Sequence, residues 1–435
     1  MVLETKKLDG ANARVYAKPS LEDFQQRAQK IAKRIAQKTK IDGFRRGKVP
    51  IDIINQRYQA QIQEESQKEL LDSVLKAGVE ELKLAPHEMM GNPAIIKFEK
   101  QDQHFDIELN IGLRPQIDLS GIETCIPSFS VEAITPEQVE ERLKQLAKEK
   151  STFVDAPEHS KISEGQGVVL DFEGLLEGKP FDGNSAKDFA LIVGEGRLLK
   201  DFEDQLIGMQ VGEEKSFSVH FPKDYASAAL ADKEVVFRVK IHKIQNREIP
   251  AIDEEFVKTV LNQEKEPTLD MLKERLKDQL FMEAKIKLYN QELKDQLVEN
   301  LEKALNFDLP HTVVEQEMDL VLRQSLQSMS KEEIEELQKD PSKVQEKRES
   351  LRERVLKSVK VTFIIDALAR QEDIQVDDKE VFQTLYYEAM MTNQNPQKLI
   401  EHYEKNFMLP AVKMTLIEDR LLTFLLDRQL AKAQA

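Results

Sequence analysis

Apolar residues recur along this chain with two different spacings, and each spacing predicts a different kind of element. Five of them near the N-terminus follow one another at intervals of three and four: Leu21, Phe24, Ala28, Ile31 and Ile35. That interval predicts a helix with one apolar face. Four others occupy every second position: Val235, Phe237, Val239 and Ile241. Alternation of this kind predicts a strand with one buried face.

Glycine marks where the two patterns separate. Nine of the 16 glycines lie between Gly165 and Gly212, and none follows Gly212. A glycine-dense stretch indicates short strands and tight turns, whereas a long glycine-free stretch rich in Glu, Lys, Gln and Leu indicates helices. We therefore expect a β domain at residues 151–246 and a helical domain at residues 247–435. Within the β domain, strands are expected near residues 168–172, 189–193 and 215–221.

The first 114 residues predict a mixed α+β domain. Ser20 followed three residues later by Asp23 is typical of a helix start, and a second helix is expected over residues 51–84. Residues 98–111 alternate in places and predict a half-buried strand. Residues 115–150 then predict an extended linker and an amphipathic helix.

Composition sets the fold class. The chain has 435 residues, enough for about three domains, and its 40% apolar and 33% charged residues indicate several small cores with much surface. We expect a multidomain α+β protein with an α+β N-terminal domain, a β domain and an elongated helical C-terminal domain. No apolar run approaches the roughly 20 residues of a membrane span. The N-terminus lacks the apolar core of a signal peptide, and a single cysteine, Cys125, fits the cytosol.

Charge is distributed unevenly along the chain. The net charge is −16, yet residues 24–50 hold nine cations against one anion, Asp42. A basic stretch in an acidic protein indicates a docking surface for RNA rather than a general affinity for nucleic acid.

The basic stretch ends in a compact motif, and its residues are Gly43, Phe44, Arg45, Arg46, Gly47, Lys48, Val49 and Pro50. Two glycines and a closing proline predict a tight loop that presents one aromatic ring and three cations. Arginine and lysine suit phosphate oxygens, and an exposed phenylalanine can stack on a base or fill an apolar pocket. A solvated basic turn is the alternative interpretation.

The motif resembles the Gly-Phe-Arg-x-Gly-Lys-x-Pro signature of the bacterial trigger factor family. The resemblance implies an ATP-independent chaperone that docks at the ribosomal exit tunnel and aids protein folding and export. It assigns ribosome binding to Gly43, Phe44, Arg45, Arg46, Gly47, Lys48 and Pro50. The implied partners are the large ribosomal subunit, through protein and rRNA near the exit tunnel, and nascent or unfolded polypeptides. A weak homodimer off the ribosome and a cytoplasmic location are also implied, without membrane or nucleotide. The resemblance further implies that residues 115–150 pack with the C-terminal domain and that this all-α domain has arms.

Residues 167–244 resemble an FKBP-type prolyl isomerase along their whole length. Ordered matches include Asp171-Phe172-Glu173-Gly174, Phe181-Asp182-Gly183 and the runs 189–194 and 197–203. The resemblance implies an antiparallel β-sheet domain with a short helix and a prolyl pocket. The implied pocket residues are Phe172, Phe181, Asp182, Phe189, Leu198, Leu199, Phe202, Tyr225 and Phe237. Asp182 is expected at the polar edge of this pocket.

Isomerisation at such a pocket needs neither a nucleophile nor a metal ion. Rotation about an X-Pro bond meets a barrier of ~18–20 kcal/mol because it breaks amide resonance. An apolar, water-poor pocket favours the twisted and less polar amide. Four positions depart from single-domain FKBP enzymes, since Phe172, Asp201, Phe202 and Ser227 stand where those enzymes usually have Tyr, Gly, Trp and Tyr. Inhibitor binding and turnover therefore do not follow from the resemblance.

The C-terminal helices hold most of the methionines. We expect Met390, Met391, Phe407 and Met408 to contact clients, because methionine adapts to irregular apolar partners. Ordinary core packing is the alternative for any single one. No P-loop is present, and none of the seven histidines has a partner at the sequence spacing of metal ligands, so no cofactor or metal is expected.

Two other functions stay open. One is a free cytosolic FKBP-type isomerase whose helices only dimerise or position it. The other is a periplasmic chaperone–isomerase, against which the missing signal peptide argues.

Overall fold

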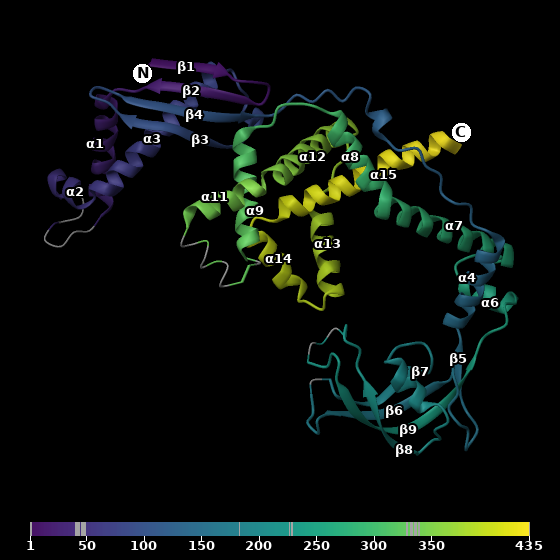
Figure 1. The fold of residues 1–435 in the computed structure, drawn as a ribbon. Coiled ribbons are helices and arrows are strands. Elements are labelled where there is room, and N and C mark those ends of the chain that lie inside the picture. The colour runs from purple at the N-terminus through teal and green to yellow at the C-terminus, as the bar shows by residue number, and fades with distance from the viewer. Residues whose placement is uncertain are drawn as a thin grey trace. The chain divides into compact units, whose positions relative to one another are not determined.

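The computed structural model describes residues 2–39, 44, 49–181, 183–225, 227, 229–327, 329–330, 334, 337 and 340–434. The chain forms two compact units. The first joins Met1–Ser130 with Lys287–Ala435, and the second is Val131–Ile286. Antiparallel sheets and a helical C-terminal part occur together, which confirms the expected multidomain α+β class (Figure 1). None of the described helices is both long and apolar enough to cross a membrane.

The first unit begins with an antiparallel sheet of four strands in the order β1-β2-β4-β3. Their bounds are Val2–Lys7 for β1, Asn12–Lys18 for β2, Met89–Lys100 for β3 and Phe105–Leu113 for β4. The alternation expected at residues 98–111 belongs to two strands, because β3 ends and a turn precedes Phe105. Within β4 the apolar residues of that pattern are buried, as a half-buried strand requires.

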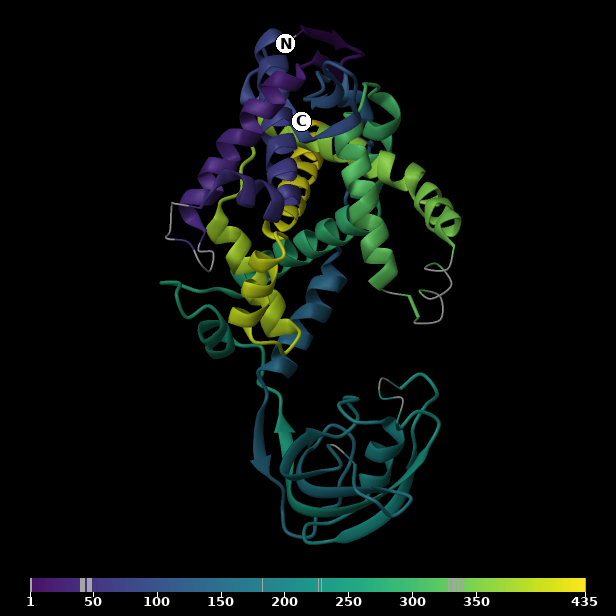
Figure 2. The same ribbon diagram turned by 90° about the vertical axis from the view of Figure 1, so that its left-hand side faces the viewer.

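Three helices accompany this sheet, with bounds Leu21–Lys38 for α1, Ile51–Arg57 for α2 and Gln59–Glu81 for α3, and a short turn η1 (Pro86–Glu88) leads to β3. The Ser20 hydroxyl caps α1 by accepting a hydrogen bond from the Asp23 N–H at 3.2 Å. The helix expected over residues 51–84 is divided at Tyr58, whose φ of −119° lies outside the helical range. Helices α1 and α3 pack side by side (Figure 2).

The rest of the first unit is helical. Its elements are η2 (Ile122–Cys125), the π-helical turn η3 (Tyr289–Leu293), α8 (Lys294–Ala304), α9 (His311–Gln327), α11 (Pro341–Ser350), α12 (Arg352–Gln371), α13 (Asp378–Met391), α14 (Pro396–Lys405) and α15 (Leu409–Gln434). Leucines from three different helices meet in its core without exposure to solvent: Leu297, Leu368, Leu421 and Leu426. Cys125 is buried in the same core.

A buried asparagine joins the N-terminal sheet to the start of α9. The Asn12 side chain donates to the Leu309 carbonyl at 3.0 Å and accepts from the His311 N–H at 2.8 Å. Thr312, also buried, donates to the Met90 carbonyl at 2.9 Å. Buried polar groups need such partners, because an unpaired one costs free energy. These bonds therefore fix how α9 lies against the sheet.

Substitution at Gly112 in β4 should loosen this junction. A Cβ at Gly112 would overlap the Thr312 hydroxyl and lie 2.5 Å from the Met90 carbonyl oxygen. We expect Gly112→Ala to lower the free energy of unfolding by roughly 1–3 kcal/mol, as overpacking does. Chemical denaturation measures the change. In a Thr312→Ala background the added cost should shrink, and an unchanged cost would show that the hydroxyl is not the obstacle.

The second unit contains a five-stranded antiparallel sheet. Its strands are β5 (Thr152–Asp155), β6 (Gly167–Leu176), β7 (Ser185–Ile192), β8 (Glu214–His220) and β9 (Glu234–Glu248), with α5 (Lys200–Leu206) between β7 and β8. The order is β5-β9-β6-β7, and β8 also pairs with β9. The long strand β9 is thus the centre of the sheet, and its alternating face meets α5 in one apolar core.

Three helices of the second unit form a separate small core. They are α4 (Pro136–Glu149), α6 (Glu254–Val260) and α7 (Leu269–Leu288), which lie near one another in Figure 1. Thr135 begins α4 with a capping box that it shares with Gln138. Leu143 of α4 then packs with Phe256 of α6 and Leu276 of α7. A helix from before the β domain thereby packs with helices that follow it in the sequence.

Candidate functional site

An aromatic cavity opens among the five-stranded sheet, α5 and the loops beside them. Its volume is about 580 Å³. The lining residues are Phe172, Phe181, Gly183, Gly196, Arg197, Leu198, Leu199, Phe202, Val219, Phe221, Tyr225, Ser227, Leu230 and Phe237. Within the described part of the chain, this lining offers no cysteine, histidine, lysine or carboxylate that could act as nucleophile or base. Shape and low polarity are what it offers a ligand.

Edge-to-face contacts hold the rings of the cavity together. The ring centroid of Phe172 lies 5.5 Å from that of Phe189, 6.0 Å from Phe202 and 6.1 Å from Phe237. Phe202 lies 5.1 Å from Phe237 and 5.2 Å from Phe217. Tilted pairs at such distances are favourable because a ring edge is positive and a ring face negative. Phe202 is almost fully buried and forms the floor, whereas Phe172 stays half-buried.

The strand pattern explains how these rings meet. The alternation of β9 buries Val235, Phe237, Val239 and Ile241 on one face, as expected from the sequence. Phe237 lies opposite Gly174 of β6. A Cβ at Gly174 would stand 2.7 Å from the Phe237 ring. Because Gly174 has no side chain, the Phe237 ring can pack directly against β6.

One cation belongs to the cavity. The Arg197 guanidinium carbon lies 4.8 Å from the centroid of the Phe189 ring, and its Nη1 donates to the Ala190 carbonyl at 2.8 Å. Stacking on the ring and bonding to β7 fix this side chain at the cavity. It gives an otherwise apolar lining one positive group.

The cavity brings together seven of the nine residues that the resemblance implied: Phe172, Phe181, Leu198, Leu199, Phe202, Tyr225 and Phe237. Phe189 does not line it and instead supports Phe172 and Arg197. Asp182 lies outside the described residues. Sequence reasoning did not assign Arg197, Val219, Phe221 or Leu230 to the pocket. Arg197 stood in the matched run 197–203, and Phe221 lies four residues before the expected Tyr225, so both could have been found.

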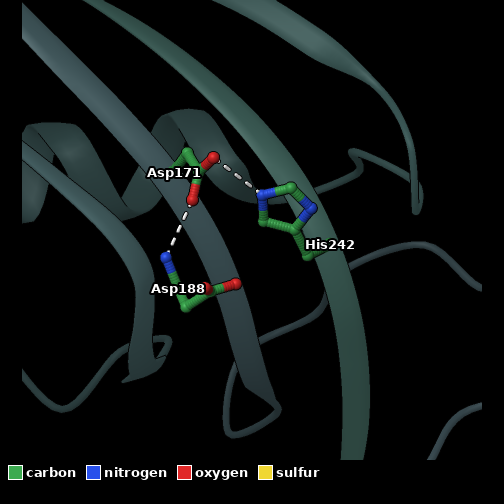
Figure 3. Close-up of side chains that lie close together, drawn as sticks. All are labelled: Asp171, Asp188 and His242. Carbon is green, nitrogen blue, oxygen red and sulfur yellow. Dashed lines mark hydrogen bonds and ion pairs between the residues drawn. The ribbon is translucent and has the colours of Figure 1, made fainter.

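A polar cluster spans three strands of the same sheet (Figure 3). His242 Nε2 lies 2.9 Å from one carboxylate oxygen of Asp171, although the ring orientation leaves that nitrogen without a well-aligned hydrogen bond. The other Asp171 oxygen accepts from the Asp188 N–H at 2.8 Å. The cluster was missed because strand pairing, not sequence spacing, brings its members together. Its three side chains have possible ligand atoms within 4.8 Å of one another, but both oxygens of Asp171 are engaged. We therefore describe the cluster as a contact between a carboxylate and an imidazole, which is an ion pair when His242 carries a proton.

Acid should weaken this ion pair. The pKa of Asp171 lies below its ordinary value of 3.8, first because of its contact with His242 and then because of the Asp188 N–H. The pair therefore stabilises the fold above the unfolded pKa, and this contribution is lost as pH falls through the lower folded pKa. We expect Asp171→Asn to melt below wild type at about pH 7 and to match it at about pH 2, by calorimetry. A difference that does not change with pH would contradict this.

The predicted ribosome-binding motif lies between α1 and α2. Gly43, Arg45, Arg46, Gly47 and Lys48 are outside the described residues. Phe44 is 38% exposed, and Pro50 forms the N-cap of α2. Val49, the second variable position of the motif, is buried with residues of α1, α2 and α3. The described part of the motif thus contains one exposed ring, Phe44, and one buried side chain, Val49.

The basic stretch of α1 is less basic than its sequence indicates. Arg34 pairs with Glu65 at 2.5 Å and with Glu69 at 3.2 Å, both on α3, and Arg27 pairs with Asp23 at 3.3 Å. Counting charges along residues 24–50 missed Glu65 and Glu69 because they follow later in the chain. The pKa of Glu65 is lowered, first by its hydrogen bond with Gln61 and then by Arg34. Among the described cations of this stretch, Arg27 and Arg34 are therefore already paired.

The four predicted client-binding residues are all exposed. Met391, at the end of α13, is 89% exposed, and Phe407, between α14 and α15, is 88% exposed. Met390 and Met408 are also exposed, and so are Tyr386 and Tyr387 on α13. Helices α13 and α14 pack together, so these side chains lie on one helical hairpin and its continuation into α15. The core-packing alternative does not hold for these four.

Three family models match consecutive parts of the chain. The model described as "Bacterial trigger factor protein (TF)" matches residues 1–146, and its C-terminal counterpart matches residues 268–427. Between them, the model "FKBP-type peptidyl-prolyl cis-trans isomerase" matches residues 158–242, which include the cavity.

Relatives and a solved structure agree with these matches. The chain is 53% identical over 434 residues to the trigger factor of Helicobacter acinonychis, covering 100% of this chain and 96% of the relative. It is 44% identical over 432 residues to that of Wolinella succinogenes, covering 99% and 100%. A solved trigger factor chaperone, from work on promiscuous substrate recognition, has a TM-score of 0.63 and 19% identity, covering 99% of this chain and all of its own. That likeness shows the fold. The chain therefore belongs to the trigger factor family, and it contains an FKBP-type peptidyl-prolyl cis-trans isomerase domain.

Proposed function

We propose that the aromatic cavity is the site at which this chaperone isomerises X-Pro bonds. The observation that carries the proposal is a cavity of about 580 Å³ lined by five phenylalanines and one tyrosine, large enough for a proline and its neighbours. Phe202 forms the floor on which the pyrrolidine ring rests. Phe172, Phe181 and Phe237 surround it, and Leu198 and Leu199 form a further wall.

The low polarity of this cavity accounts for catalysis, and no covalent bond forms between the protein and the peptide. Rotation about the X-Pro bond removes amide resonance, so the twisted amide has a less polar carbonyl than the planar one. Burial among phenylalanine rings removes water that would stabilise the planar form. Arg197 is the charged side chain among the described lining residues, and it selects which residues flank the proline. The residues do not change covalently, and the site needs no cofactor.

A tryptophan reporter tests the assignment. The chain contains no tryptophan, so Phe202→Trp would introduce a single fluorophore at the cavity floor. We expect a proline-containing tetrapeptide to change its emission saturably, because the bound ring excludes water from the indole. The same peptide with alanine in place of proline should not. If catalysis persisted in this variant while proline peptide left the emission unchanged, the site would lie elsewhere.

We propose that residues 43–50 attach the N-terminal domain to the large ribosomal subunit, through both protein and rRNA. Support comes from the three cations of the motif and from the exposed ring of Phe44. Phosphates suit the cations, and an apolar pocket suits the ring. The pairing of Arg34 with Glu65 and Glu69 lowers the positive charge that α1 presents, whereas the motif concentrates three cations within eight residues.

We propose that the exposed apolar side chains of α13 and its neighbours hold unfolded chains. Met390, Met391, Phe407 and Met408 offer flexible, apolar contacts of no fixed shape, which suit many sequences. Serine at both Met391 and Phe407 should therefore weaken the suppression of aggregation. Serine at Ile95 and Ile96, two exposed residues of β3, is the matched control and should not.

The division of labour that we propose follows the expected domains. Residues 1–114 bind the ribosome, residues 115–150 link and pack with the C-terminal helices, residues 151–246 isomerise proline bonds, and residues 247–435 hold clients. A cytoplasmic chain, partly bound to ribosomes and weakly dimeric when free, fits these roles. Sedimentation equilibrium tests the dimer, and a single monomeric species at every concentration would rule it out.

A further inference from the structure

A buried carboxylate lies directly behind the cavity. Glu203 on α5 is only 3% exposed, whereas Asp201 and Asp204 on the same helix are exposed. A carboxylate removed from water is unfavourable unless hydrogen bonds replace its hydration. Its position next to Phe202, which forms the floor of the cavity, raises the question of which groups satisfy it.

Three backbone N–H groups of one loop satisfy it. One oxygen of Glu203 accepts from Gly194 at 2.7 Å and from Gly196 at 3.3 Å, and the other accepts from Leu198 at 3.0 Å. Hydrogen bonds to an ionised acceptor are stronger than neutral ones. The three donors belong to alternate residues of the segment between β7 and α5, so a single side chain holds the whole segment.

The segment that Glu203 holds forms one wall of the cavity. Gly196, Arg197, Leu198 and Leu199 all line it. Helix α5 therefore contributes the floor through Phe202 and fixes the adjoining wall through the next residue. The side chain of Arg197 attaches the same segment to β7 as well, by donating a hydrogen bond to the Ala190 carbonyl.

We propose that Glu203 is a positioning residue of the isomerase, whose carboxylate holds residues 194–198 in the shape that a proline peptide requires. The inference rests on the assignment of the cavity as the prolyl site. A wall that is already ordered does not have to be ordered by the peptide, so binding is stronger. Without the carboxylate, the peptide must order the segment, and KM rises.

Glu203→Gln tests this role. An amide keeps the size of the side chain but replaces one acceptor by a donor that faces N–H groups. We expect KM to rise at least tenfold for a proline tetrapeptide, with kcat changing less, and hydrogen exchange at Gly194, Gly196 and Leu198 to accelerate. Asp204→Asn removes the same charge from the same helix at an exposed position and should leave both constants within twofold.

A purely structural role predicts a different result. If Glu203 only stabilised the domain, its loss would reduce the folded fraction, so that apparent kcat would fall while KM stayed constant. Leu206→Ala provides this comparison, because Leu206 is fully buried on α5 but does not line the cavity. It should lower the melting temperature and leave KM unchanged. The same pattern for Glu203→Gln would overturn the proposal.

Two further variants keep the test decisive. Should Glu203→Gln fail to fold, Gly196→Ala disturbs the segment with the carboxylate intact, because Gly196 has φ +72° and open space around it. It should also raise KM, and an unchanged KM would overturn the proposal. Phe172→Ala, assayed beside them, tests whether the cavity is the prolyl site, separately from the role of Glu203. If it retains full activity, the cavity is not the site, whereas if it alone is inactive, only the role of Glu203 fails.

Discussion

Phe172→Ala is expected to lower kcat/KM for proline peptides by roughly 100-fold, about 2.7 kcal/mol of transition-state stabilisation. Phe172 contacts three other rings and lines the cavity, so its removal both widens the space and admits water. Water stabilises the planar amide and restores the barrier. A coupled assay with a proline tetrapeptide, at a temperature well below unfolding, measures the loss.

Phe153→Ala is the matched control for Phe172→Ala. Phe153 is an exposed phenylalanine on β5 of the same sheet and does not line the cavity. Its removal should leave kcat/KM within about twofold of wild type, as surface substitutions usually do. Equal losses in the two variants would mean that the activity depends on the stability of the domain and not on the cavity.

Phe44→Ala/Arg45→Ala/Lys48→Ala should abolish stable co-sedimentation with ribosomes. The substitutions remove two cations and one exposed ring, and losing a central contact of this kind costs about 2 kcal/mol or more, hence roughly 30-fold in affinity. Binding of wild type should also fall steeply as salt rises, because phosphate contacts release counterions. Co-sedimentation at several salt concentrations measures both effects.

A charge-matched variant controls for the change in net charge. Lys258→Ala/Lys303→Ala also removes two cations, from exposed positions on α6 and α8. It should pellet with ribosomes as wild type does. Equal binding by the triple variant and wild type would show that residues 43–50 are not the dock, and a free cytosolic chaperone–isomerase would become the better account.

Local patterns were enough to predict the elements that depend on local interactions. The alternation along β9 and the cap at Ser20 follow from neighbouring residues, and both occur as expected. Tyr58, which divides the helix expected over residues 51–84, carries no glycine or proline signal nearby in the sequence. Strands β1 and β2 were not foreseen, because they are short and become strands by pairing with each other and with β4.

Parts of the sites that depend on contacts between distant segments could not be predicted from the sequence. Ordered motifs indicated the rings of the cavity, because each motif is local. The pairing of Arg34 with Glu65, of His242 with Asp171, and of Glu203 with its loop depends on how helices and strands pack. Neither the number of charges in a stretch nor the sequence spacing of possible ligand residues shows which helices and strands pack together.

Suppression of aggregation, measured for two variants side by side, tests the central claim that one chain carries separable chaperone and isomerase sites. Phe172→Ala should protect an unfolded client protein as well as wild type does, although its isomerase activity is strongly reduced. Met391→Ser/Phe407→Ser should protect it poorly and keep full isomerase activity. If Phe172→Ala lost protection as well, the cavity would be needed to hold clients, and the two functions would not be separate.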